Sequence, residues 1–284
     1  MPEYIDAYGI PIVYDVHPAK GEPRAVVQLL HGVGEHAGRY GALIEALTIG
    51  GYAVYAGDLR GHGRTGMKQH GGPAKLGHLG RGGLRATVAA VFQLTGIIRR
   101  DNPGLPLVIL GHSGGSFIAQ MVLNAHPERF DGIVLSGSAY RMPGWIRTGG
   151  HNRPWDGPSA TGLEWLASDP TVGAAFRADP LTTEEPPIRL FGPIEVAKNF
   201  GRPRKNLGRD LPVLLMVGRD DTVGGPRSVH RLADAYRTRS GLTDVTTLVY
   251  PDSRHEIFND ARQAEVRADL LAWLDARFAV RQGD

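Results

Sequence analysis

The stretch Leu107-Val-Ile-Leu-Gly-His-Ser-Gly-Gly115 decides how the rest of this 284-residue chain is interpreted. Four apolar residues typical of a buried β-strand lead directly into the pattern Gly-x-Ser-x-Gly, and residues 116–125 can form a helix. A strand, a sharp turn and a helix are the context in which this pattern exposes its serine as a nucleophile. The three glycines of the stretch are the small residues that such a turn needs. We therefore predict that Ser113 is a catalytic nucleophile.

Strand-like segments alternate with helical patterns on both sides of this stretch. The strand-like segments are 10–16, 25–30, 51–56, 132–136, 211–217 and 246–250, and the main helical stripes start near Tyr40, Leu84, Pro226 and Val266. This alternation predicts an α/β fold with a mostly parallel central sheet and helices on both faces. Segment 10–16 alternates in polarity and fits an edge strand, whereas residues 66–83 are predicted to be an irregular surface loop.

The regular alternation stops at about Tyr140 and resumes near Leu211. Residues 140–205 are rich in Pro, Gly and Asp and hold three of the four tryptophans, with short helical pieces predicted at 163–167 and 172–178. We predict that residues 1–139 and 206–284 form one core and that residues 140–205 form a mainly helical cap inserted into it. The tryptophans fit the interior of the cap and the apolar wall of a binding site equally well.

Composition excludes several classes of chemistry. The net charge is only +3 and no Lys/Arg tract is interleaved with aromatics, so we expect no nucleic-acid partner. The absence of cysteine excludes disulfides and thiolate chemistry. The eleven histidines show no His-x-x-x-His spacing, so we expect no metal site. With neither a signal-like N-terminus nor an apolar run of about 20 residues, a soluble, cytoplasmic protein is expected.

An acid and a histidine follow Ser113 in the order that a serine-based triad requires. The strand ending at Val217 runs into Gly218-Arg-Asp-Asp-Thr-Val223, and the strand ending at Tyr250 runs into a loop that contains His255. Both lie just past a strand end, where α/β sheets place their ligand sites. We predict that His255 takes the proton of the serine hydroxyl and that a carboxylate orients His255. Asp221 is the preferred acid, and Asp220 is its competitor.

The tetrahedral intermediate of acyl transfer needs two hydrogen-bond donors, which form an oxyanion hole. We assign these donors to the backbone N–H groups of Gly114, directly after the nucleophile, and of Val33, in the glycine-rich loop after strand 25–30. Other polar residues are given supporting roles: His31 and Glu35 orient this loop, Asp58, Arg60 and His62 form a turn network, and His112 points away from Ser113.

Four motifs together carry a family resemblance: His31-Gly-Val-Gly-Glu-His36 through Tyr40, Asp58-x-Arg-Gly-His-Gly63, Gly111-His-Ser-Gly-Gly115 and Arg254-His-Glu-Ile-Phe-Asn259. They resemble the monoacylglycerol lipase and lysophospholipase-like, serine aminopeptidase S33-type branch of the α/β-hydrolases. The resemblance implies the α/β-hydrolase fold, esterase or lipase chemistry without a cofactor, an acid at Asp221, and an oxyanion hole at Val33 and Gly114. The chain departs from the family at Gly114, where a methionine or another bulky residue is common.

The predicted function is hydrolysis of carboxylic esters, such as monoacylglycerols or other medium-chain acyl esters, through an acyl-enzyme on Ser113. Three alternatives stay open: the same fold acting on a lysophospholipid, lactone, amide or peptide, an acyltransferase, and a non-catalytic binding module. The expected partner is a small-molecule acyl ester, and the cap is expected to make transient contact with a lipid surface. Residues 140–205 are expected to select the substrate.

Overall fold

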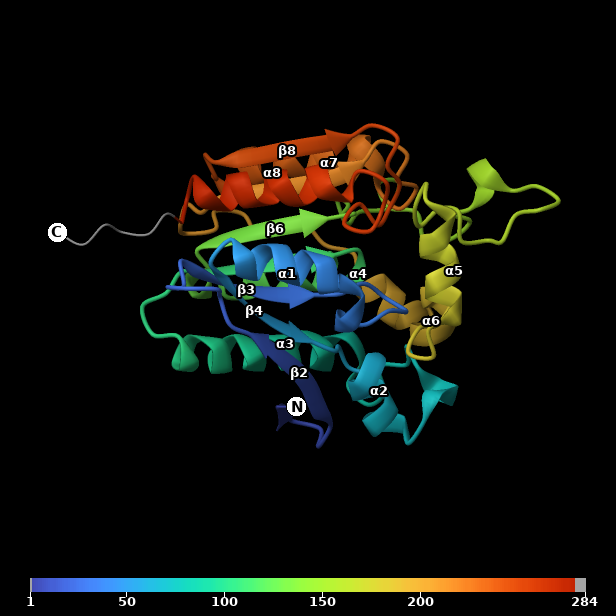
Figure 1. Ribbon diagram of the computed structural model, residues 1–284, viewed down its shortest axis with the longest axis horizontal. Helices are drawn as coiled ribbons and strands as arrows, with labels where there is room; N and C mark the ends of the chain where they lie inside the picture. The colour runs from blue at the N-terminus through green and yellow to red at the C-terminus, as the bar shows by residue number, and fades with distance from the viewer. Residues whose placement is uncertain (1, 279–284) are drawn as a thin grey trace.

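One continuous sheet of eight strands organises the computed structural model, which describes residues 2–278 (Figure 1). The strands are β1 (Glu3–Ile5), β2 (Pro11–His17), β3 (Ala25–Leu30), β4 (Tyr52–Gly57), β5 (Leu107–His112), β6 (Gly132–Ser136), β7 (Val213–Gly218) and β8 (Val245–Tyr250). Their order across the sheet is β1-β2-β4-β3-β5-β6-β7-β8. The pairs β1-β2 and β2-β4 are antiparallel and every other neighbouring pair is parallel. The predicted, mostly parallel sheet is therefore confirmed.

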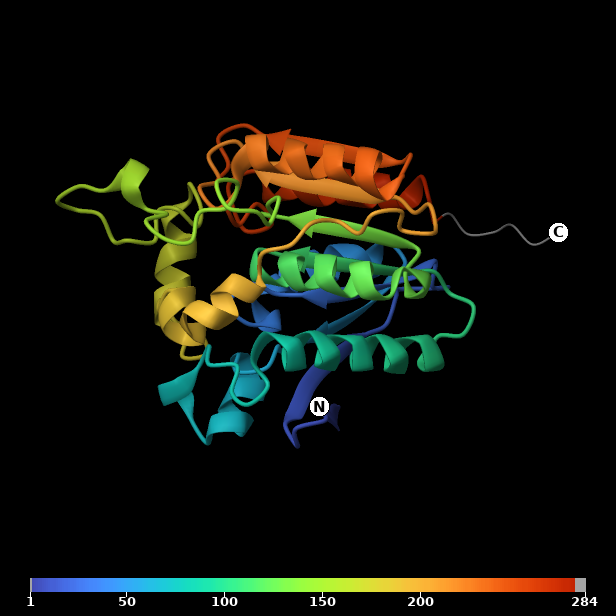
Figure 2. The same cartoon turned by 180° about the vertical axis from the view of Figure 1, so that it is seen from behind.

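Helices cover both faces of this sheet, as Figures 1 and 2 show from opposite sides. The helices α1 (Gly41–Ile49) and α8 (Gln263–Asp275) pack on one face, and α3 (Gly83–Asp101), α4 (Gly114–Ala125) and α7 (Gly225–Ala235) pack on the other. Strand β3 contributes to the apolar cores on both faces of the sheet, because successive strand side chains point to opposite faces. Its residues Val26 and Leu30 join one apolar cluster, and Val27 and Leu29 join the other.

The chain leaves the sheet after β6 and returns to it at β7. Between them lie two α-helices, α5 (Pro170–Ala178) and α6 (Pro187–Lys198), at the edge where the parallel strands end (Figure 1, right). Helix α6, which the sequence did not predict, is broken at Gly192, where φ is +76° ahead of Pro193. We use the name cap segment for residues 140–205, and the division into a core and an inserted cap stays a proposal.

The helix predicted at 163–167 is wrong, because this piece of the cap segment is a single turn. Its carbonyl groups serve partners outside the turn: those of Glu164 and Ala167 accept hydrogen bonds from the Arg254 guanidinium, and that of Leu166 accepts one from the Glu256 amide. A helix would use these carbonyls internally. Contacts with a distant loop therefore override the local helical pattern.

The surface loop predicted for 66–83 is also partly wrong, because it begins inside helix α2 (Gly63–His70). Gly66 in this helix serves close packing instead: a Cβ on Gly66 would lie 2.3 Å from the Gly61 carbonyl oxygen. Thr65 anchors the helix by accepting a hydrogen bond from the Val13 amide and donating one to the Asp58 carbonyl. Segment 10–16 is not the edge strand, because β1 lies outside it.

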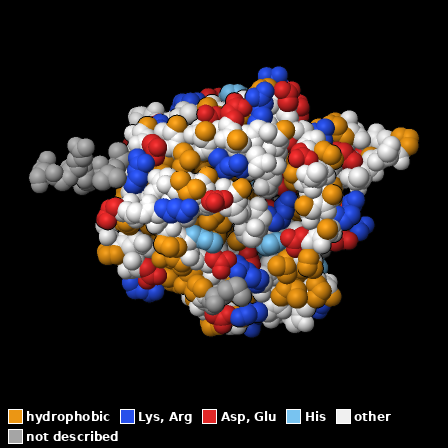
Figure 3. Space-filling model, in the orientation of Figure 1, with side chains coloured by type: hydrophobic (Ala, Val, Ile, Leu, Met, Phe, Trp, Pro, Cys, Tyr) orange, Lys and Arg blue, Asp and Glu red, His pale blue; other side chains and the backbone are white. Residues whose placement is uncertain are grey.

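Charged side chains of both signs are interspersed over the face shown in Figure 3, where Lys and Arg lie among Asp and Glu. This mixing agrees with the small net charge of +3. Within residues 2–278, no helix combines the length and the apolarity needed to cross a bilayer.

Candidate active site

Ser113 occupies the sharp turn between β5 and α4. Its backbone has φ +50° and ψ −123°, a conformation that is strained for any residue with a side chain. The turn fits only because its neighbours are glycines: a Cβ on Gly111 would lie 2.6 Å from the Gly115 carbonyl oxygen, and one on Gly115 would lie 2.3 Å from the His31 carbonyl oxygen. The amide of Ser113 donates to the Ser136 carbonyl at 2.9 Å, which ties the turn to the neighbouring strand.

His255 and Asp221 form a buried pair beside this turn. Nδ1 of His255 lies 2.9 Å from Oδ2 of Asp221, and the other carboxylate oxygen accepts a hydrogen bond from the Val223 amide at 2.7 Å. Asp220, the competing acid, is exposed, so its neighbour is the residue that meets the histidine. Nε2 of His255 is buried and has no partner among the described residues, and His255 and Ser113 line the same pocket.

For each member of this pair, burial and the neighbouring charge have opposite effects on the pKa. Burial disfavours the protonated ring of His255, but the Asp221 charge and hydrogen bond outweigh it, and the pKa of His255 is raised. For Asp221, burial would raise the pKa of the carboxyl, but the His255 charge and hydrogen bond and the Val223 amide together lower it. The pair is thus arranged to hold a proton on the imidazole while the carboxylate stays ionised.

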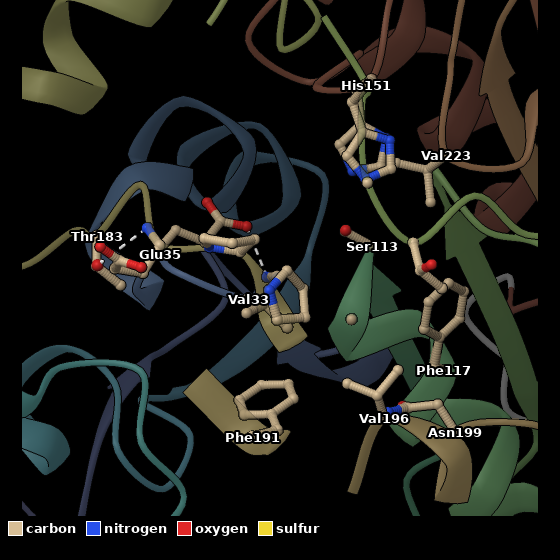
Figure 4. Close-up of a pocket in the computed structure, with 18 of the residues that line it drawn as sticks. Val33, Glu35, Ser113, Phe117, His151, Thr183, Phe191, Val196, Asn199 and Val223 are labelled. Carbon is tan, nitrogen blue, oxygen red and sulfur yellow. Dashed lines mark hydrogen bonds between the residues drawn. The ribbon is translucent and has the colours of Figure 1, made fainter. Parts of the chain in front are cut away.

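The two backbone amides predicted as oxyanion donors lie close together at the mouth of this turn. Neither the Val33 nor the Gly114 N–H donates a hydrogen bond to another described residue, and Gly114 is the first residue of α4, where no helical acceptor exists. A Cβ on Gly114 would lie 3.3 Å from the Val33 nitrogen. Figure 4 shows Val33 and Ser113 on opposite sides of the same space. Two free donors next to a serine fit the demands of an oxyanion hole.

The close approach of the Val33 side chain explains why position 114 is a glycine. A Cβ on Gly114 would lie 2.5 Å from Cγ2 of Val33, which is too close for two carbon atoms that belong to different residues and are not bonded. The branched side chain of Val33 thus occupies the space that a bulky residue at position 114 would need. The departure from the family pattern at Gly114 therefore has a local steric reason.

The loop that carries Val33 is held by a buried charged network. Glu35 accepts hydrogen bonds from the Gly32 amide and the Tyr40 hydroxyl, each at 2.6 Å, and from Arg39 at 2.8 Å. Arg39 also binds both carboxylate oxygens of Glu256, next to His255, at 2.8 Å. The oxyanion loop and the histidine loop are therefore joined through one guanidinium, a link that the sequence analysis did not identify.

The remaining polar residues of the motifs hold turns. The His31 ring lies 2.7 Å from the Gly32 carbonyl oxygen and accepts a hydrogen bond from the Leu59 amide. Asp58 accepts bonds from the Ala37 amide and from Arg64. Nδ1 of His112 lies 3.2 Å from the Ser136 hydroxyl, and the ring makes no hydrogen bond to Ser113. These contacts fit supporting roles.

Arg60 and His62 complete the turn network. The buried guanidinium of Arg60 pairs with Asp6 and donates to the carbonyl groups of Leu79 and Arg81. The His62 ring lies 2.8 Å from the Arg60 carbonyl oxygen, and burial lowers its pKa to about 4. Both residues therefore stabilise the loop after β4 from within.

An apolar pocket of about 370 Å³ opens above Ser113. Figure 4 shows Phe191 and Val196 of α6 on one side of it and His151 and Val223 on the other. This volume is at the small end of the range for small-molecule sites. Among residues 2–278, no cluster of three or more His, Asp or Glu side chains could hold a metal ion.

The cap segment brings the Trp165 ring against His255 and the His151 ring against Trp165, and the motifs revealed neither. The Trp165 ring centroid lies 5.0 Å from that of His255, and the His151 ring lies 4.9 Å from that of Trp165. The sequence marked Trp165 only as one of several cap tryptophans and did not single out His151. Because residues 151 and 165 join His255 in one pocket only through tertiary folding, no local spacing could have identified them.

A parallel sheet with an elbow serine after β5, and an acid and a histidine after β7 and β8, is the architecture of the α/β-hydrolases. The family described as serine aminopeptidase, S33 (Hydrolase_4) matches residues 21–262, and the chain belongs to this family. The resemblance inferred from the four motifs is thereby confirmed.

Several relatives of this chain are esterases and lipases. The monoacylglycerol lipase of Mycolicibacterium smegmatis is 31% identical over 274 residues, which cover 94% of this chain and 93% of the lipase. A thermostable carboxyl esterase from Bacillus coagulans, solved in complex with glycerol, shares the fold with a TM-score of 0.81, 24% identity and 98% coverage of both chains. A Paleococcus ferrophilus monoacylglycerol lipase does so with a TM-score of 0.69, 24% identity and coverage of 94% and 99%. The chain is therefore an esterase- and lipase-like α/β-hydrolase.

Proposed function

We propose that this protein hydrolyses carboxylic esters that carry one acyl chain, monoacylglycerols among them. One observation carries the proposal: the elbow serine and the free Nε2 of the buried His255–Asp221 pair line the same apolar pocket. The pocket suits a chain of methylene groups because its walls are mainly apolar. Its volume of about 370 Å³ favours one chain over several.

In the proposed reaction, Oγ of Ser113 attacks the ester carbonyl carbon while Nε2 of His255 takes the hydroxyl proton. The N–H groups of Val33 and Gly114 hold the oxyanion. His255 then gives its proton to the leaving alcohol, and the acyl group stays on Ser113. Water attacks this acyl-enzyme in the same way, with His255 as the base, and releases the acid. Asp221 remains ionised throughout and stabilises the imidazolium.

Hydrolysis of amides at a free amino terminus, the activity suggested by the family's description, is less well supported. An aminopeptidase needs a carboxylate available to bind the ammonium group of its substrate. The four carboxylates on the pocket wall are already engaged: Glu35 and Glu256 with Arg39, Glu184 with Arg177, and Glu185 with Arg189. These ion pairs leave the ester as the better substrate.

Contact between the cap segment and a lipid surface is part of the same proposal. Ile188 and Ile194 of α6 are 45% and 73% exposed, close in the chain to the pocket residues Phe191 and Val196. Exposed apolar side chains near a site mark contact surfaces. Co-sedimentation with phosphatidylcholine vesicles should fall in the double variant Ile188→Ser, Ile194→Ser. Equal sedimentation of both proteins would contradict the contact.

The test of the proposed function is a panel of substrates supplied to the wild type and to Ser113→Ala. Monoacylglycerols and p-nitrophenyl esters should be turned over, and lysophospholipids and aminoacyl p-nitroanilides should be poor substrates. Turnover by Ser113→Ala should be lower by about 10⁶-fold, because the nucleophile is gone. Preference for the anilides, or activity that survives in Ser113→Ala, would reject the proposal.

A further inference from the structure

Aromatic rings from two parts of the chain contact the imidazole of His255. Trp165, in the cap segment, lies 5.0 Å away between ring centroids at an interplanar angle of 35°. His112, next to the elbow serine, lies 4.8 Å away at 51°. The cap segment thus contributes one large π-face directly to the histidine of the site.

Backbone hydrogen bonds hold the Trp165 turn against the histidine loop. The His255 amide donates to the Trp165 carbonyl at 3.4 Å, and the Glu256 amide donates to the Leu166 carbonyl at 2.7 Å. The guanidinium of Arg254 reaches the carbonyls on either side of them, at 2.6 and 3.0 Å. These hydrogen bonds join the turn that carries the indole to the loop that carries the imidazole. The two rings are therefore held at a fixed separation.

Packing also restrains the indole. Trp165 contacts a cluster of Phe117, Ala139 and Val223 beside the pocket and a second cluster of cap residues that includes Phe176. A side chain that bridges two apolar clusters has little freedom to turn away from His255. The ring arrangement is thus a built feature of the site.

We propose that Trp165 is a positioning residue whose indole stabilises the imidazolium that His255 becomes each time it holds the serine proton. The proposal rests on the proposed function, in which that protonated ring forms in both half-reactions. The face of tryptophan attracts a cation within about 6 Å of its centroid, and more strongly when water is excluded. Such an attraction shifts the protonation equilibrium of His255 toward the protonated ring by roughly 10–30-fold.

The surroundings of His255 both favour and oppose its protonated form, so a contribution from the indole can change the balance. Asp221, Glu256 and Glu35 favour the protonated ring, and burial opposes it. The neighbouring histidines add little repulsion, because burial lowers the pKa of His112 to about 3 and that of His151 to about 4 and keeps both neutral. Glu35 and Glu256 share Arg39, which offsets their charge.

The experiment compares Trp165→Leu, which keeps an apolar cover without a π-face, with Trp165→Phe, which keeps a smaller one. Trp145→Leu is the matched control, because this cap tryptophan packs against Tyr140 and Arg227 instead of His255. The pKa of His255 is measured by NMR in protein labelled with [13C]histidine, with His255→Gln identifying the resonance. The acidic limb of kcat/KM for a p-nitrophenyl ester is measured alongside.

The pKa of His255 should fall by about one unit in Trp165→Leu, by less in Trp165→Phe, and not at all in the control. The acidic limb should move the same way, and kcat should fall roughly 10-fold or more with a smaller change in KM. An unchanged pKa in folded Trp165→Leu overturns the proposal, even if Tm and kcat fall, because a purely structural role predicts that result.

Two further outcomes are also decisive. If the wild type hydrolyses no ester, the proposed function fails, but the NMR titration still tests the indole contact by itself. If Trp165→Leu does not fold, Trp165→Phe decides, because it keeps a ring in the same packing. In that variant a pKa equal to that of the wild type counts against the proposal.

Discussion

The edge of the sheet and the cap segment contribute to the site in different ways. Ser113, Asp221 and His255 each follow a parallel strand within a few residues, so the backbone of the sheet sets their positions. The cap segment is held by scattered contacts, such as the Thr183 amide on the Gly34 carbonyl at 2.8 Å and the His36–Asp179 pair at 2.8 Å. We propose that the sheet positions the reacting groups, and that the cap segment selects what reaches them and adds one supporting ring, Trp165, to His255.

Among variants that keep the Ser113 nucleophile, the largest effect should come from the acid at the sheet edge. Asp221→Asn should lower kcat by about 10⁴-fold, because the amide cannot stabilise the imidazolium and favours the wrong tautomer of His255. Asp220→Asn, one residue earlier and exposed, is the matched control and should keep full activity. Steady-state kinetics with a p-nitrophenyl ester distinguish them. A larger loss at Asp220 would mean that the acid has been misassigned.

Gly114→Ala should lower kcat by about 10²-fold, because the new methyl group displaces Val33 and its N–H. The backbone of Gly114 has an ordinary negative φ, so the effect is steric and not conformational. The double variant Val33→Ala, Gly114→Ala should regain most of the activity, since the Cγ2 methyl group of Val33 that the new Cβ would meet is gone. Wild-type rates in Gly114→Ala, or no recovery in the double variant, would disprove the steric account.

The pH profile should show the raised pKa of His255 directly. Only the neutral imidazole can take the serine proton, so kcat/KM should fall tenfold per pH unit below this pKa. Because Asp221 raises the pKa, the acidic limb should lie above 6.5, the ordinary value for histidine. Rates measured between pH 5 and 9 give the limb, and a midpoint below 6.5 would contradict the favourable pairing.

The smallest effect should come from the cap segment, and it should depend on the substrate. Val196→Trp adds bulk to the pocket wall and should lower kcat/KM for a p-nitrophenyl decanoate by about tenfold, with little change for the acetate. Ile49→Trp, at an exposed position of α1 that does not line the pocket, is the control and should change neither. An equal loss on both esters would mean that Val196 does not select the acyl chain.

The sheet could be predicted from the sequence because its signals are local. The apolar run before Gly111 indicates a buried strand, and the small residues around Ser113 indicate the sharp turn after it. The histidine and the acid then follow strands whose order is fixed by the fold. The choice of Asp221 over Asp220 depended on family spacing, and their geometry agrees with it, because only Asp221 meets His255.

The cap segment could not be predicted to the same extent, because long-range contacts determine its structure. The turn at Trp165 forms where its carbonyls meet Arg254 and Glu256, ninety residues away in the chain. Helix α6 contains Gly192 and Pro193, which weaken any helical pattern. Arg39 was visible only as a motif residue. Its bridge between two loops could not be predicted, because the loops come together only in the folded chain.

The central claim is that Ser113 is the nucleophile activated by His255. The most direct measurement is reaction with a fluorophosphonate probe, followed by mass spectrometry of the digested protein. The account predicts one adduct, on the peptide that holds Ser113, with labelling lost in Ser113→Ala and strongly slowed in His255→Gln. Labelling at another serine, or equal labelling of the wild type and Ser113→Ala, would contradict it.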